Sequence, residues 1–181
     1  MNQPKLKTSL AKNEDVIELN VINKKLQKKI MGRIIPGFGI NSPGLKDLSK
    51  DKDKVLILRQ EGKIIGFSWM HHNLNYNHVA LAGVALLEMY RTPIQANYLW
   101  NKTFAFINKK FPGIKIWGQA SELPYRKKQV SRAAVEARVK MLKKRGFQTD
   151  HCMPGEVIML PRTLRKILSK QKPKTIRRRN T

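Results

Sequence analysis

The chain has a single cysteine, Cys152, and only 12 acidic residues among 181. A single thiol excludes an internal disulfide and any zinc site that needs several cysteines. No stretch approaches the ~18 consecutive apolar residues of a membrane-spanning helix. The first residues, MNQPKLKTSLAKNEDV, also lack the apolar core of a secretory signal. These absences favour an intracellular protein without a membrane span.

The shortage of acids leaves a strong positive charge. Lys and Arg number 37, which gives a formal net charge of +25 at pH 7. Residues 123–181 alone carry eighteen basic side chains against three acids. Such a field implies a polyanionic partner, with nucleic acid first and an anionic membrane surface second. Because no base-reading motif is present, we expect contact with DNA or RNA that does not depend on base sequence.

Three basic segments are the candidate nucleic-acid contacts: a loop, a predicted helix face and the C-terminal end. A solvated lysine-rich face is the ordinary alternative, but such a face is usually balanced by acids. The tryptophans could stack bases, although they lie in apolar segments that favour core packing. The candidate residues are Arg126, Lys127, Lys128, Lys140, Lys143, Lys144, Arg145, Arg177, Arg178 and Arg179.

The order of predicted elements indicates one mixed α/β domain. A helix is expected from residue 13 to about 31, then a hairpin of 55–59 and 64–70 around a turn at 60–63, and an apolar strand at 79–88. Thr92 caps a helix that begins at Pro93 and ends by 111–113. A strand at 114–118, a helix through 130–144 and a strand at 156–160 follow. The expected sheet is largely antiparallel, with five to six strands.

The expected domain covers residues 1–160, and residues 161–181 form a basic C-terminal tail that is partly disordered. Leu164, Ile167 and Leu168 would hold a single helical turn of this tail. The last residues, from 172 on, would be disordered or fold on a partner.

Three histidines, His71, His72 and His78, suggest a metal site at first sight. Adjacent histidines on a strand point to opposite faces, and no carboxylate or further cysteine accompanies them. We therefore expect no metal, and we interpret Cys152 as an ordinary part-buried thiol.

Four segments resemble the GNAT superfamily of acyl-CoA N-acyltransferases. They are EGKIIGFSWM, LLEMYRTPIQANYLW, IKIWGQAS, and MLKKRGFQ followed by EVIMLPR. The resemblance covers about residues 13–160 and implies a central sheet, flanked by helices, that opens at a V between the strand ending near Glu88 and the strand beginning near Ile114. It also implies acetyl-CoA as cofactor, with its pyrophosphate held by Arg91, Thr92, Ile94, Gln95 and Ala96.

Two positions depart from the family pattern. The family's pyrophosphate loop reads (R/Q)-x-x-G-x-(G/A), and here Ile94 stands at the glycine while Pro93 removes an N–H donor. The closing helix of the family usually offers a tyrosine as general acid, and Leu142 stands there instead. Both departures indicate weakened or lost activity.

The resemblance suggests Glu88 as the base that deprotonates an amine, with Tyr125 or Tyr90 as a substitute acid. The alternative for Glu88 is an ion pair with Arg91 at the end of the strand. Three functions stay open: a basic GNAT-like protein that binds nucleic acid with weakened or lost activity, an active acetyl-CoA-dependent N-acetyltransferase acting on a nucleic-acid-associated amine, and a non-catalytic structural or ribonucleoprotein component.

Overall fold

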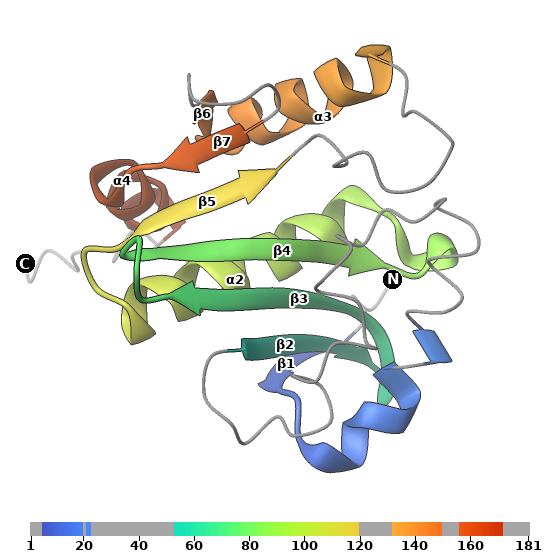
Figure 1. Cartoon of the computed structure of the whole chain (residues 1–181). Helices are drawn as coiled ribbons and strands as arrows, with labels where there is room; N and C mark the ends of the chain where they lie inside the picture. Colours follow the sequence, from blue (N-terminus) through green and yellow to red (C-terminus); the bar gives the residue numbers. More distant parts are fainter. Residues whose placement is uncertain (1–4, 20, 23–52, 120–131, 150–155, 172–181) are drawn as a thin grey trace, which may run out of the picture.

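A computed structural model describes residues 5–19, 21–22, 53–119, 132–149 and 156–171 (Figure 1). The strands are β1 (Leu6–Leu10), β2 (Asp53–Gln60), β3 (Lys63–Asn73), β4 (His78–Leu86), β5 (Lys115–Gln119), β6 (Gln148–Thr149) and β7 (Glu156–Met159). The helices are α2 (Pro93–Lys110), α3 (Arg132–Lys144) and α4 (Pro161–Gln171), with short 3-10 turns η1 (Asn13–Asp15) and η3 (Glu88–Tyr90). Residues 16–19 and 21–22 are helical as well.

Within the described residues the strands form one sheet of seven, in the order β1-β2-β3-β4-β5-β7-β6. Every neighbouring pair is antiparallel except β4 and β5. The predicted open, largely antiparallel α/β sheet is therefore confirmed. The predicted five to six strands were too few, because β1 and the two-residue β6 carry no alternation strong enough to be seen in the sequence.

The predicted hairpin is present as β2 and β3. Glu61 and Gly62 make its turn with φ of 52° and 82°, a left-handed pair that suits the twist of the two strands. The register shifts between Leu58 and Arg59, so Ile65 is an extra residue on β3. This bulge puts Ile64 and Phe67 on the same face of the sheet, which strict alternation would not do.

Two apolar clusters cover the two faces of the sheet. The larger joins β2–β5 and β7 to α2, α3 and α4 through residues such as Leu99, Phe104 and Ile116. The smaller lies on the opposite face, where Leu19 and Ile22 of the N-terminal helical segment pack on β2 and β3. The chain is thus a sheet between two unequal helical layers (Figure 1).

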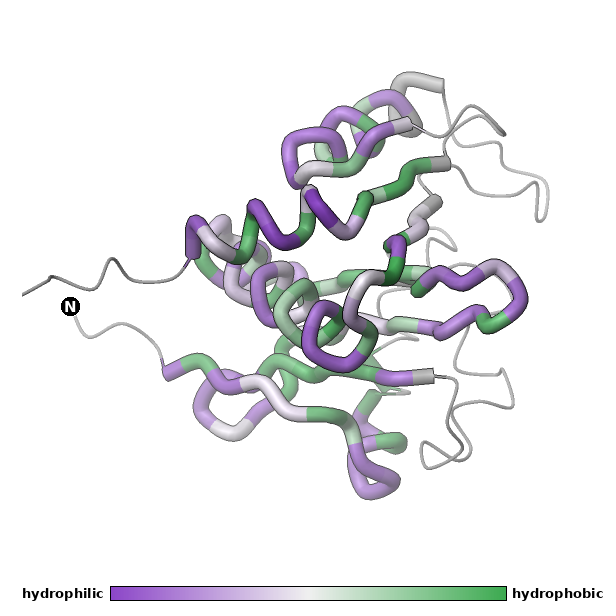
Figure 2. Tube along the Cα trace, turned by 90° about the vertical axis from the view of Figure 1, so that its left-hand side faces the viewer, coloured by the Kyte–Doolittle hydropathy of each residue, from purple (hydrophilic) through white to green (hydrophobic). Residues whose placement is uncertain are grey.

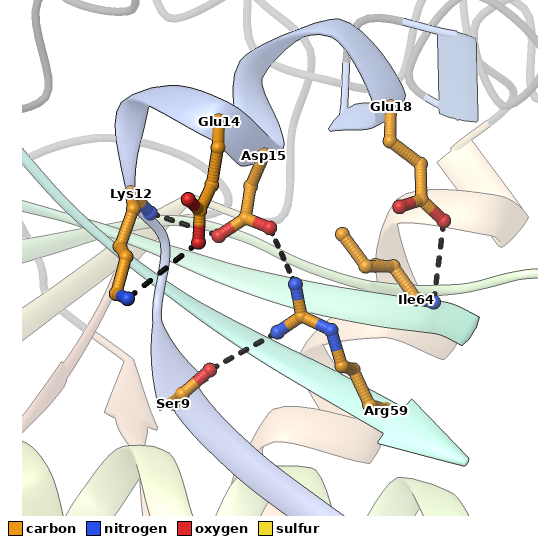
Figure 3. A network of polar contacts seen from close by, with 7 residues as sticks. All are labelled: Ser9, Lys12, Glu14, Asp15, Glu18, Arg59 and Ile64. Carbon is orange, nitrogen blue, oxygen red and sulfur yellow. Dashed lines mark hydrogen bonds and ion pairs between the residues drawn. The ribbon is translucent and has the colours of Figure 1, made fainter. Parts of the chain in front are cut away.

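A polar network fixes the N-terminal layer on the sheet (Figure 3). The Arg59 guanidinium on β2 donates to the buried carboxylate of Asp15 and, over 3.1 Å, to Ser9 Oγ on β1. The Asp15 carboxylate also accepts from the Lys12 N–H at 2.9 Å. Glu18 Oε1 accepts from the Ile64 N–H at 3.3 Å. A buried carboxylate needs such partners, and here they tie β1 to β2.

One connection differs from the sequence prediction. The sequence predicts strands at 64–70 and 79–88, whereas β3 runs on to Asn73 and β4 starts at His78, which leaves a turn at 74–77. Only the beginning of the predicted first helix lies within the described residues.

The C-terminal prediction needs a correction. In place of a single helical turn, α4 spans eleven residues, and Leu164 is 2% exposed within the larger cluster. Ile167 and Leu168 pack against that cluster. Figure 2 shows how hydrophilic and hydrophobic residues alternate along this helix. The apolar core therefore includes residues of α4, beyond residue 160, and residues 172–181 lie outside the described part.

Candidate functional site

The sheet opens into a wedge between β4 and β5. These strands pair in parallel at only three positions, where His78, Val79 and Ala80 face Lys115, Ile116 and Trp117. Beyond Ala80, β4 continues to Leu86 along β3 alone, while β5 continues along β7. The edge of β4 at 81–86 therefore has no strand partner on its β5 side among the described residues. The V predicted between these two strands is present.

The loop between β4 and α2 lies at the mouth of this wedge. The Leu87 N–H donates to Ile65 O on β3 at 2.8 Å, and three later N–H groups are bonded within the loop: Tyr90 donates to Leu87 O, Arg91 to Glu88 O and Thr92 to Tyr90 O, over 2.9–3.1 Å. These groups cannot also reach a ligand without a rearrangement of the turn. The next residue, Pro93, has no N–H.

The start of α2 offers the remaining donors. Thr92 caps the helix as predicted, with its Oγ1 accepting from the Gln95 N–H at a long 3.4 Å. The Ala96 N–H donates to Thr92 O. For the Ile94 N–H, no acceptor is found among the described residues. Ile94 itself is 64% exposed, so its side chain stands where an incoming anion would approach.

Gln95 and Arg91 flank these donors. Gln95 is buried and its Nε2 donates to Gln60 Oε1 on β2 at 3.3 Å, while its own Oε1 has no partner among the described residues. Arg91 is exposed and donates through Nε to Leu86 O at 3.0 Å. Its Nε contact holds the guanidinium beside the end of β4. Of the predicted cofactor residues, the structure thus brings Arg91 through Ala96 together in one turn.

The catalytic candidates lie less close to the wedge than the predicted cofactor residues do. Glu88 is exposed in η3, beyond the end of β4 and outside the strand edge that borders the wedge. Tyr90 packs partly against the core. Tyr125 lies outside the described residues. Leu142, at the position of the family's acid, is buried in the larger cluster and offers only carbon.

The three histidines lie at the other end of the β3–β4 hairpin. His72 packs on the Phe111 ring with centroids 4.7 Å apart, whereas His78 stacks between Tyr76 and Trp117 at 5.9 and 5.8 Å. Burial, with a smaller contribution from the charges of His71 and His72, lowers the pKa of His78. Within the described ranges, no group of three or more His, Cys, Asp or Glu is arranged to hold a metal ion.

The lowered pKa of His78 predicts a loss of stability in mild acid. Its ordinary pKa is 6.5, so the unfolded chain takes up this proton first as the pH falls, and protonation favours unfolding. We expect the urea midpoint to fall between about pH 7.5 and about pH 5.5, and to fall less in His78→Gln. An equal fall in both proteins would mean that other groups cause the loss.

The basic candidates divide into three sets. Lys140, Lys143 and Lys144 are exposed on α3. Arg145 instead covers the Trp100 ring at 4.8 Å and donates to Asn97 Oδ1 at 3.3 Å, so its guanidinium joins the end of α3 to α2. Burial lowers the pKa of Arg145. Arg126, Lys127, Lys128, Arg177, Arg178 and Arg179 lie outside the described residues.

One group of cations falls within the basic tail expected from the sequence and is absent from the candidate nucleic-acid contacts predicted there. Arg162, Arg165, Lys166 and Lys170 are all exposed on α4. Their spacing of i, i+3, i+4 and i+8 is the signal that a helix would gather them on one face. The sequence predicts this segment as a partly disordered tail, and in a disordered segment such spacing does not place side chains on a common face.

No protein-family model matches the sequence, and no curated protein matches it. Solved structures do. The chain is similar to the PaiA N-acetyltransferase of Thermoplasma acidophilum, solved with coenzyme A, with a TM-score of 0.61 and 15% identity over 85% of this chain and 96% of that one.

Two further solved structures show the same likeness. A GNAT-family acetyltransferase of Staphylococcus aureus Mu50 gives a TM-score of 0.63 at 12% identity, over 87% of this chain and 99% of that one. Spermidine N-acetyltransferase of Vibrio cholerae, solved with CoA and spermine, gives 0.62 at 12% identity, over 88% and 97%. The chain therefore has the GNAT acetyltransferase fold.

Proposed function

We propose that this chain binds coenzyme A or an acyl-CoA in the wedge between β4 and β5, with weakened or lost acyl transfer, and that its basic surface binds nucleic acid. The observation that carries the first part is the separation of β4 from β5 after three paired positions, which leaves the edge of β4 open as far as the loop that leads into α2. This geometry offers an open strand edge next to a helix N-terminus, which suits an extended amide chain that ends in phosphates.

The chain's own groups fit coenzyme A in part. The edge of β4 at 81–86 can pair with the amides of a pantetheine arm. The donors left for a pyrophosphate are the Ile94 N–H and the Arg91 guanidinium, with the Gln95 N–H available only if it gives up its long bond to Thr92 Oγ1. Fewer donors than a glycine loop would provide should make the binding weak.

The positive net charge of the chain limits which molecules could accept an acyl group from it. The Vibrio neighbour is named for spermidine and was solved with spermine, and a net charge of +25 opposes such polycations. The same charge attracts polyanions, so a nucleic acid, or an amine held close to one, is the favoured partner. Leu142 favours weak or absent catalysis, because a buried hydrocarbon cannot protonate a leaving thiolate.

The test is calorimetric titration of the full chain with acetyl-CoA, together with an assay for acyl transfer. We expect Ile94→Gly to tighten acetyl-CoA binding about tenfold, since a glycine lets the phosphate approach the backbone and gain one charge-assisted hydrogen bond. Ala105→Gly, an exposed change in the middle of α2, is the matched control and should leave the affinity unchanged. Equal affinity for Ile94→Gly and the parent chain would contradict the site.

A further inference from the structure

The cations of α4 form an unbalanced charged stripe. Arg162, Arg165, Lys166 and Lys170 are exposed, and α4 contains no acidic residue. On a helix these positions share one face, opposite the face of Leu164, Ile167 and Leu168. We call these four residues the α4 stripe.

Packing holds the stripe in a fixed orientation. Leu164 is 2% exposed in the larger cluster, and Gln171 Nε2 donates to Asn101 Oδ1 on α2 at 2.8 Å. Nearer the start of the helix, a Cβ built on Gly146 would lie 3.2 Å from Thr163 Cγ2 and 2.7 Å from Ile167 Cδ1, so α4 lies directly against the turn after α3. That turn follows the exposed Lys143 and Lys144, which extend the positive charge beyond α4.

The docked apolar face argues against a membrane as the partner. An amphipathic helix that binds a lipid surface inserts its apolar residues, whereas those of α4 are used in the core. The sequence of α4, PRTLRKILSKQ, also offers no aromatic ring on which an unpaired base could stack. The α4 stripe therefore offers a partner only positive charge, on a helix that is fixed by its packing on the core.

We propose that the α4 stripe docks on the phosphate backbone of double-helical nucleic acid. The stripe extends over eight residue steps, about 12 Å of helix, and a duplex carries one charge per ~1.7 Å of its axis, so all four cations can face phosphates. This proposal rests on the nucleic-acid part of the proposed function and is independent of coenzyme A.

The experiment measures binding of the full chain to a DNA duplex across a salt series. The variant carries Arg162→Gln, Arg165→Gln, Lys166→Gln and Lys170→Gln. Its slope of log affinity against log salt should be shallower by about 0.9 for each phosphate that the stripe no longer neutralises, or up to about 3.6 in all. The matched control carries Lys5→Gln, Lys7→Gln, Lys12→Gln and Lys63→Gln, exposed residues on and around β1 and at the start of β3, with the same change in charge. The control should shift the slope little.

Other outcomes overturn the proposal in distinguishable ways. Equal slopes for the stripe variant and the parent chain would show that another surface binds the duplex and leave the proposed function standing. Tighter binding to single-stranded RNA, to vesicles of anionic lipid or to polyglutamate than to the duplex would assign the stripe a different partner. No binding of the parent chain to duplex or RNA would remove the nucleic-acid function as well. An unchanged circular dichroism spectrum and acetyl-CoA affinity show that the variant is folded.

Discussion

Gly66→Ala is expected to lower the free energy of unfolding by about 3 kcal/mol. A Cβ on Gly66 would lie 2.6 Å from the Ala85 carbonyl oxygen and 3.3 Å from Leu86 Cα, both backbone atoms of the adjacent strand. Because Gly66 pairs with Leu86 in the β3–β4 ladder, these atoms can make room only if β4 moves away from β3 and the ladder hydrogen bonds lengthen. Urea denaturation followed by tryptophan fluorescence measures the change.

Gly118→Ala is the matched control for this substitution. Gly118 also lies in a strand, but its Cβ would meet Val157 Cγ2 at 3.4 Å and Phe147 Cε1 at 3.8 Å, which are ordinary contacts. We expect it to be neutral or to stabilise slightly, because alanine reduces the freedom of the unfolded chain. Equal losses for both variants would show that glycine is not required at 66 for space.

A chain that ends at Leu160 is expected to lose cooperative unfolding, whereas a chain that ends at Gln171 keeps it. The shorter chain lacks Leu164, whose burial alone is worth about 2–5 kcal/mol, and it uncovers the residues that Ile167 and Leu168 cover. Domains of this size have only about 5–15 kcal/mol in total. Urea denaturation of both chains by circular dichroism provides the comparison.

Leu164→Ala in the full chain separates packing from length. It should lower the urea midpoint without abolishing the transition, while Lys170→Ala, an exposed change on the same helix, should have almost no effect. Equal midpoints for the chains ending at 160 and 171 would restore the domain boundary expected from the sequence.

The sequence by itself determined the elements whose signals are local. The turn at Glu61 and Gly62, the Thr92 cap before Pro93, and the helical period of α2 each depend on residues a few positions apart. Their order was enough to predict a mixed α/β sheet, whereas the cofactor loop expected after the third apolar strand came from the resemblance to the GNAT superfamily. The substitutions of glycine and tyrosine by Ile94 and Leu142 were equally visible, since they concern identity and not arrangement.

Only the tertiary structure decided the features that depend on distant partners. β1 is a strand because β2, about fifty residues later, pairs with it, and Arg59 reaches back to Asp15. The wedge exists because β5 pairs with β4 at one end and with β7 along its length. The sequence alone indicated a basic tail at α4, because four of its eleven residues are cations. Whether this segment forms a packed helix depends on the burial of Leu164, and α2 and the turn after α3 supply the surfaces that bury it.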